Sequence, residues 1–257
     1  MRVAAVGFSP IKGTRHLSYD EVRLDPDGLV GDRGYCLVDV AARRVLRTVQ
    51  HGALVAVEAR AYADSLTVAL PDGSSATGCP EATGERLTCE YWGRPAELDL
   101  LDGPHSDLFS DYLGKPVRLA RAPRRAVVYG AGVTILSRGS LAELARRLGG
   151  DGLDAHRFRA SVVVDQNDAA ADASDAEDRW AGRLLTLGEA VVRVGEPVPR
   201  CAVVDLSPAS GIRDLPVLRE LAGYRPRAST GEPVFGVYAE VVVPGGVRAG
   251  DAAGLAD

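Results

Sequence analysis

Cys201 is the residue whose neighbours best suit it for chemistry. It follows a segment with two prolines, Pro197 and Pro199, and Arg200 directly precedes it. Prolines restrict the backbone that leads to the thiol, and a neighbouring cation favours the thiolate, which acts as nucleophile and metal ligand. The alternative is a buried cysteine that packs as a small apolar residue. The local sequence alone favours this alternative.

The other three cysteines show no such setting. Cys36 lies inside an apolar stretch typical of a buried strand, and Cys79 and Cys89 have no partner at metal-ligand spacing. No C-x-x-C pair occurs, so we expect four reduced thiols in a cytoplasmic protein.

Three isolated basic residues stand where strands begin or end. Lys12 follows Ser9-Pro10-Ile11, Arg33 follows Gly31-Asp32, and Arg159 follows Phe158 just before a β-branched run. Basic side chains at strand ends can converge on a phosphate or another oxyanion, and arginine then offers two parallel hydrogen bonds. The alternative is three solvated surface charges.

Other sequence motifs for metal binding, catalysis or nucleotide binding are weak or absent. The four histidines do not occur at the i, i+3 or i, i+4 spacing of a zinc site. No G-x-S-x-G, Walker loop or G-x-G-x-x-G motif is found. The segment Gly130-Ala131-Gly132 is a glycine-rich loop that either approaches a ligand closely or forms only a turn.

The elements that must position these residues are mostly short strands. The first half predicts strands separated by turns, then a helix that Gly114 ends. The second half predicts a helix from Ser137, further strands and an acidic surface loop at Asp165–Asp178. The predicted strands are Val3–Phe8, Gly34–Val40, Ala53–Ala59, Ser65–Leu70, Arg86–Tyr91, Ala96–Leu100, Thr134–Leu136, Ser161–Val164, Leu184–Val194 and Val234–Val243, with helices at Ser106–Leu113, Ser137–Leu148 and Leu215–Leu221 and a tight turn at Pro244–Gly246.

Composition excludes several classes of protein. Of 257 residues, 46% are hydrophobic and 25% charged, as in a globular protein with a core rather than a disordered chain. The net charge of -5 argues against non-specific binding to nucleic acid or to an anionic membrane. We see no apolar stretch long enough to span a bilayer and no signal peptide, so we expect a cytoplasmic protein.

Taken in order, several short motifs resemble the MOSC family with its N-terminal β-barrel domain. Phe8–Gly13 resembles the lysine-bearing opening of that domain, and Gly28–Arg33 its GL-x-x-DR signature. Arg200-Cys201 resembles the RC motif of the MOSC domain. The further matches are Ile135–Leu141, Phe158-Arg159, Pro208 and Gly211, Leu218–Arg225, Phe235–Tyr238 and Pro244 to Asp251. The resemblance covers nearly the whole chain. Within this family, the chain is similar to the mitochondrial amidoxime-reducing component and its bacterial relatives.

The resemblance implies a mainly β, α+β protein with an N-terminal β-barrel domain at 1–120 and a MOSC domain at 121–257. It implies a molybdenum cofactor (a pyranopterin, Mo-molybdopterin) between them, with Cys201 as metal ligand, and reduction of N-hydroxylated small molecules. The residues matched to cofactor binding are Lys12, Arg33, Gly130, Ala131, Arg159, Ser161 and Arg200. Electrons would come from a separate electron-transfer protein, because no flavin, haem or iron–sulfur motif is visible. The alignment also suggests Tyr129 and His51 at the pocket mouth.

Several positions depart from the family pattern. Val49 stands where the family often has arginine, with Arg47 as a nearby substitute. Ser161 replaces an asparagine, and Gly130 and Ala131 align with small hydroxyl residues. These departures keep a second function open, in which a metal-free protein uses Cys201 as a persulfide carrier or as a nucleophile in specialised metabolism. A module without activity is a third alternative.

Overall fold

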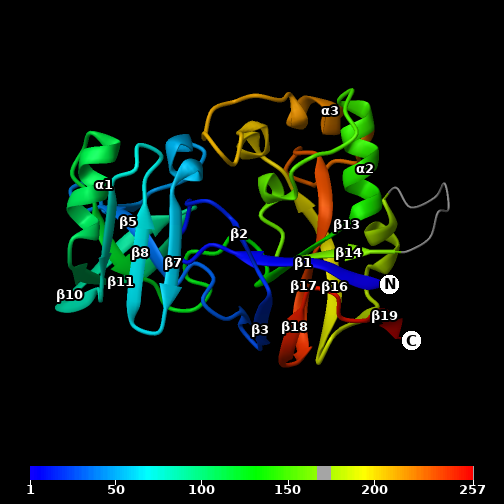
Figure 1. Ribbon diagram of the computed structural model, residues 1–257, viewed down its shortest axis with the longest axis horizontal. Coiled ribbons are helices and arrows are strands. Elements are labelled where there is room, and N and C mark those ends of the chain that lie inside the picture. Colours follow the sequence, from blue (N-terminus) through cyan, green and yellow to red (C-terminus); the bar gives the residue numbers. More distant parts are fainter. Residues whose placement is uncertain (167–174, 257) are drawn as a thin grey trace.

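Strands carry most of the regular structure in the computed structural model, which describes residues 1–166 and 175–256. The strands form one closed barrel, an eight-stranded sheet and two three-stranded sheets. The barrel and the eight-stranded sheet lie side by side along the long axis of the molecule (Figure 1). Three α-helices accompany them within the described ranges. The predicted mainly β, α+β class is confirmed.

The barrel belongs to the first half of the chain. Its strand order is β10–β11–β12–β5–β6, and a parallel pair between β10 and β6 closes it. Ala96 and Leu98 on β11 are buried and alternate with more exposed neighbours, as expected for a strand with one face in a core. The elements of this half are β5 (Tyr35–Asp39), β6 (Arg44–Val45), η1 (Gly52–Ala56), β7 (Glu58–Tyr62), β8 (Ser65–Ala69), β9 (Ser75–Gly78), β10 (Glu81–Tyr91), β11 (Arg94–Asp102), α1 (His105–Leu113) and β12 (Arg118–Arg121), with β7–β8–β9 forming a separate sheet beside the barrel.

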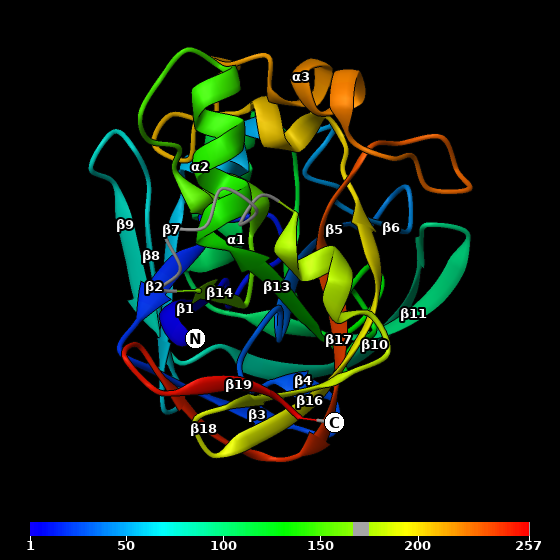
Figure 2. The same cartoon turned by 90° about the vertical axis from the view of Figure 1, so that its right-hand side faces the viewer.

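The eight-stranded sheet combines the second half of the chain with its first residues. Its order is β19–β15–β16–β17–β13–β14–β1–β2, and β3 pairs with β18 in a neighbouring sheet. Figure 2 shows helices α2 and α3 above this sheet. The elements are β1 (Arg2–Phe8), β2 (Leu17–Tyr19), β3 (Glu21–Asp25), β4 (Gly28–Leu29), β13 (Val133–Ser137), α2 (Arg138–Arg147), η2 (Ala155–Phe158), β14 (Val162–Asp165), η3 (Ala176–Trp180), β15 (Leu184–Leu187), β16 (Ala190–Pro199), η4 (Ala202–Asp205), α3 (Val217–Tyr224), β17 (Val234–Val243), β18 (Gly245–Arg248) and β19 (Ala253–Ala256).

Helix α2 forms where the apolar spacing predicts it. The Ser137 hydroxyl accepts a hydrogen bond from the Ser140 amide at 3.0 Å and so caps the first turn. Leu141, Leu144 and Ala145 are buried on one face. The cap places the end of β13 and the start of α2 at a defined angle above the sheet.

The chain departs from four sequence predictions. The predicted strand Ala53–Ala59 begins as the 3₁₀ helix η1, because its backbone bonds locally: the Leu54 amide donates to the His51 carbonyl at 3.1 Å and the Val57 amide to the Leu54 carbonyl at 3.0 Å. Leu184–Val194 is a hairpin of β15 and β16 and not one strand. The turn predicted at Pro244–Gly246 instead leads directly into β18.

The fourth departure concerns the acidic segment predicted as a surface loop. Residues 167–174 of this segment lie outside the described residues. Its end forms η3, in which Glu177 is buried, so this part of the prediction is wrong. The buried Glu177 carboxylate accepts a hydrogen bond from the Ser140 hydroxyl at 2.7 Å, which explains why an acidic residue is tolerated there.

No helix in the described ranges is long and apolar enough to cross a membrane.

Candidate functional site

Two loops that lie side by side carry Lys12 and Arg33. The first joins β1 to β2 within the large sheet, and the second joins β4 to β5 of the barrel. The Lys12 amide donates to the Tyr35 carbonyl at 2.8 Å, and the Arg33 amide donates to the Ser9 carbonyl at 2.8 Å. The Asp32 carboxylate in turn accepts from the Ser9 amide at 3.3 Å. These backbone bonds fix the two basic side chains against each other, although 21 positions separate them in sequence.

Arg159 reaches the same place from the other half of the chain. It follows η2, and its guanidinium donates to the Thr14 carbonyl at 2.6 Å and to the Ser9 hydroxyl at 2.7 Å. Arg33 and Arg159 both have positive φ angles, 50° and 53°. This conformation is costly for residues with a Cβ and persists where the surrounding structure imposes it, often at functional sites. The structure therefore brings all three predicted basic residues together.

The electrostatics of this cluster favour an anion. Burial, together with the charges of Arg33 and Arg159, lowers the pKa of Lys12 to about 7. Burial and the charge of Arg33 lower the pKa of Arg159 to about 10, so it remains protonated at neutral pH. For Arg33, burial is outweighed by its ion pair with Asp32 at 2.5 Å, and its pKa is raised. Three positive centres thus share one neighbouring carboxylate, which leaves positive charge for a ligand to neutralise.

Arg200 and Cys201 lie at the end of β16. The buried Arg200 guanidinium donates from Nε to the Phe235 carbonyl at 2.7 Å and from Nη1 to the Phe158 carbonyl at 2.8 Å. Its Nη2 is also buried and has no hydrogen-bond partner among residues 1–166 and 175–256. Cys201 is an exposed free cysteine at the N-cap of η4. The packed-cysteine alternative therefore fails for Cys201, whereas Cys36 and Cys89 are buried as an apolar residue would be.

Tyr238 on β17 connects the two groups of basic residues. Burial raises the pKa of its phenol, and the charges of Arg200, Arg33 and Cys201 all act on it. Lys12 adds a further aromatic contact, because its Nζ lies 4.8 Å from the centre of the Tyr91 ring. The arrangement is an exposed thiol beside a set of largely buried cations lined by tyrosines. Such a site can hold an anionic ligand and offer one sulfur to it.

Two family models match the two halves of the chain. The family model described as MOSC domain matches residues 123–253, and the one described as MOSC N-terminal beta barrel domain matches residues 1–116. The chain belongs to the MOSC family. This confirms the resemblance drawn from the short motifs. No curated protein matches the chain significantly.

The solved structures that match this MOSC protein resemble it only distantly. The YuaD protein from Bacillus subtilis is 14% identical with a TM-score of 0.46, over 98% of this chain and 93% of that chain. YiiM from Escherichia coli is 13% identical with a TM-score of 0.41, over 100% of this chain and 70% of that chain. YiiM from Geobacillus stearothermophilus is 19% identical with a TM-score of 0.34, over 49% of this chain and 54% of that chain. Likeness of this degree carries no argument about function.

The remaining predicted site residues of this MOSC protein occupy different settings. The Ser161 hydroxyl accepts from the Thr134 amide at 3.1 Å, so it joins β13 to β14. Gly130 and Ala131 lie in the loop before β13, where Gly130 has a φ of 76° and its Cα faces the Tyr238 ring. Sequence reasoning missed Tyr238 and Tyr91 as site residues. For Tyr238 the available signal was its place in the closing Phe235–Tyr238 motif.

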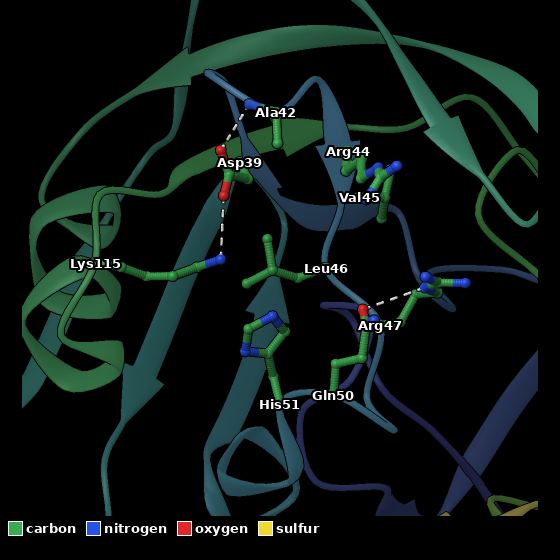
Figure 3. Close-up of a pocket in the computed structure, with 9 residues that line it drawn as sticks. All are labelled: Asp39, Ala42, Arg44, Val45, Leu46, Arg47, Gln50, His51 and Lys115. Atoms are coloured by element: carbon green, nitrogen blue, oxygen red, sulfur yellow. Dashed lines mark hydrogen bonds and ion pairs between the residues drawn. The ribbon is translucent and has the colours of Figure 1, made fainter.

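A separate hollow lies in the N-terminal domain. It has a volume of about 330 Å³, and Figure 3 shows its lining side chains, with Lys115 paired to Asp39 at 3.2 Å. His51 and Arg47 both line it. Cys201 is not among its lining residues. The suggestion that His51 stands at the mouth of the cofactor pocket therefore gains no support from this hollow.

Restoring a hydroxyl at Gly130 should destabilise the protein. A Cβ at this position would overlap the Tyr238 ring. In addition, the backbone here has a positive φ of 76°, which is unfavourable for a residue that carries a Cβ. We expect Gly130→Ser to lower the free energy of unfolding by about 2 kcal/mol. Ala131→Ser is the matched control and should change it by less than about 0.5 kcal/mol. Urea denaturation of both variants measures the difference; equal effects would contradict the close packing of Gly130 on Tyr238.

Proposed function

We propose that this MOSC protein is a molybdenum-dependent oxidoreductase that binds a pyranopterin molybdenum cofactor and reduces N-hydroxylated small molecules. The observation that carries the proposal is the convergence of Lys12, Arg33 and Arg159, together with the bond from Arg200 to the carbonyl of Phe158, which precedes Arg159. The exposed Cys201 directly follows Arg200. Membership of the MOSC family supports it, because that family includes cofactor-binding proteins of this kind. The substrate class comes from the family resemblance alone.

The residues present fit such a cofactor. The cofactor carries a phosphate, and an anion placed against Lys12 would restore the protonated amine that burial disfavours. The unpaired Nη2 of Arg200 offers one more buried donor. A thiolate at Cys201 is a soft ligand and suits a metal already bound by dithiolene sulfur.

Each side chain then has a defined task. Lys12, Arg33 and Arg159 hold the anionic end of the cofactor, with Asp32 and Ser9 fixing the two arginines. Arg200 positions the cysteine loop through its bonds to two backbone carbonyls. When bound, the cofactor supplies the two-electron redox chemistry, and the protein supplies orientation and charge.

The proposal also includes a partner and a location. A separate electron-transfer protein delivers the electrons. The four free cysteines suit the reducing conditions of the cytoplasm, where we place this protein.

Elemental analysis for molybdenum tests the proposal. The protein is purified from a host that makes the cofactor, beside Cys201→Ser and the control Cys79→Ser, which alters the other exposed cysteine. We expect near-stoichiometric metal in the wild type and in the control, and clearly less in Cys201→Ser. Loss of the thiolate ligand is the physical reason.

A lack of metal in all three proteins would overturn the cofactor proposal. Intact mass then examines the second candidate function, which the exposure of Cys201 favours. A persulfide increment that disappears in Cys201→Ser would identify a sulfur carrier.

A further inference from the structure

The hairpin between β10 and β11 ends in a tryptophan that its backbone does not favour. Tyr91 pairs with Arg94, so Trp92 and Gly93 form a two-residue loop. Both have positive φ angles, 51° and 78°. Two positive angles define a type I′ turn, whose preferred residues are Asn-Gly. A bulky side chain is strained at the first position, and a strained residue held in place is a sign of a function.

The Trp92 ring is presented to solvent between two other side chains. It is 47% exposed, and Tyr129, which is 52% exposed, lies against it with ring centres 5.6 Å apart and planes tilted by 58°. The Arg47 guanidinium stands 4.7 Å from the centre of the Trp92 ring. The ion pairs of the described residues do not include Arg47. Its Nε donates to the Gln50 side-chain carbonyl at 3.3 Å, and Figure 3 shows this bond.

This group of side chains borders the cation site. A hydrogen bond from Arg94 to the Val128 carbonyl ties the hairpin to the loop that carries Tyr129. The next residue, Gly130, packs against Tyr238. The charges of Arg200 and Cys201 both influence the pKa of the Tyr238 phenol. Tyr91, the residue before Trp92, is buried with its ring centre 4.8 Å from Lys12 Nζ, so the aromatic side chains of this hairpin reach from the cation site to solvent.

We propose that Trp92, Tyr129 and Arg47 form a binding platform for a planar aromatic ring that carries a negative charge, such as an aromatic carboxylate. The ligand ring would stack on Trp92 in the place that the Arg47 guanidinium takes in the free protein, with the edge of Tyr129 beside it. The displaced guanidinium would pair with the carboxylate. The exposed aromatic pair suits the ring of such a ligand. The neighbouring cation, which has no carboxylate partner among the described residues, suits its negative charge. Its use as a substrate-recognition surface rests on the proposed function; the binding itself does not.

Tryptophan fluorescence gives a direct readout of binding. The chain has two tryptophans, and the second, Trp180, is only 3% exposed. The full-length protein is titrated with benzoate, benzamide and cyclohexanecarboxylate. We expect benzoate to change the emission and to bind about tenfold more tightly than either the neutral ring or the saturated acid. Equal binding of all three probes, or binding of none, would overturn the proposal.

Variants assign the binding to individual side chains, with calorimetry as the readout because one variant removes the fluorophore. Trp92→Asn suits the turn, so it should raise the melting temperature while weakening benzoate at least about tenfold. Arg47→Gln should weaken benzoate but leave benzamide unchanged. Tyr62→Asn removes an aromatic ring that is 87% exposed elsewhere and serves as the control. Unchanged benzoate binding in Trp92→Asn would exclude the platform.

The two proposals fail separately. Benzoate binding needs no metal, so it is measured on the same preparations whose molybdenum content is known. Absence of benzoate binding from metal-loaded protein removes the platform and leaves the cofactor proposal in place. Binding to metal-free protein supports the platform even where the cofactor proposal has failed.

Discussion

Replacing Lys12 by methionine should stabilise the ligand-free protein near neutral pH and, under the proposed function, weaken its binding of the molybdenum cofactor. Burial and two neighbouring arginines lower the pKa of Lys12 from 10.5 to about 7. Below about pH 7 the folded protein must keep a charged amine in a cation-rich site, which is costly. Because Lys12 retains some exposure, we expect Lys12→Met to gain about 3 kcal/mol there, less than the full pKa difference implies.

The sign of the pH dependence follows from proton linkage. Between about pH 7 and the ordinary lysine pKa of 10.5, the unfolded chain binds more protons at this position than the folded one. The wild type should therefore gain stability as the pH rises through this window, and Lys12→Met should not. The two proteins should converge at the alkaline end.

Urea denaturation across this pH range measures the effect. Lys115→Met is the matched control, since Lys115 is the other lysine of the chain and is paired with Asp39. Its variant should keep the wild-type slope with pH. If Lys12→Met also kept that slope, the low pKa of Lys12 would be disproved. Lower molybdenum content in Lys12→Met would in addition support its task in the proposed function.

Phe235→Ala should cause the largest loss of stability among the single changes considered for this protein. The ring is fully buried in the cluster with Leu136 and Leu221, and its centre lies 4.7 Å from that of Phe158. Removing a buried phenylalanine leaves a cavity and costs roughly 3–5 kcal/mol. Because Arg200 donates to the backbone of Phe235, the cysteine loop should also become less well held.

Thermal and urea unfolding measure this loss, and amide hydrogen exchange around Cys201 measures the loosening. Val243→Ala on the same strand is the control, because Val243 is 46% exposed and should change stability by less than about 0.5 kcal/mol. A loss below about 1 kcal/mol for Phe235→Ala would mean that this core does not support the cysteine loop.

The accuracy of the sequence predictions follows the range of the interactions involved. Helix α2 was predicted because its cap and apolar face lie within a dozen neighbouring residues. The composition of Ala53–Ala59 predicts a strand, whereas in the folded chain this segment packs into the core of the N-terminal half and begins as a 3₁₀ helix. The sequence predicts the type of an element correctly where its local residue pattern and its tertiary packing agree. It fails where tertiary packing overrides the local pattern.

The platform residues illustrate what local reasoning overlooked. Trp92 sits in a turn whose sequence, Trp-Gly, does not resemble the preferred Asn-Gly. Arg47 was considered only as a replacement for an absent arginine, and its contact with Trp92 joins residues 45 positions apart. Such contacts leave no periodic signal in a single sequence.

By itself the sequence determined the mainly β class, the order of the family motifs and the identity of Cys201 as the cysteine beside an arginine. Only the tertiary structure decided that Lys12, Arg33 and Arg159 face one another, because strand β1 leaves the first half to pair with β14 of the second. That crossing carries the Lys12 loop to Arg159. Their mutual repulsion, and hence the demand for an anion, exists only once the chain has folded.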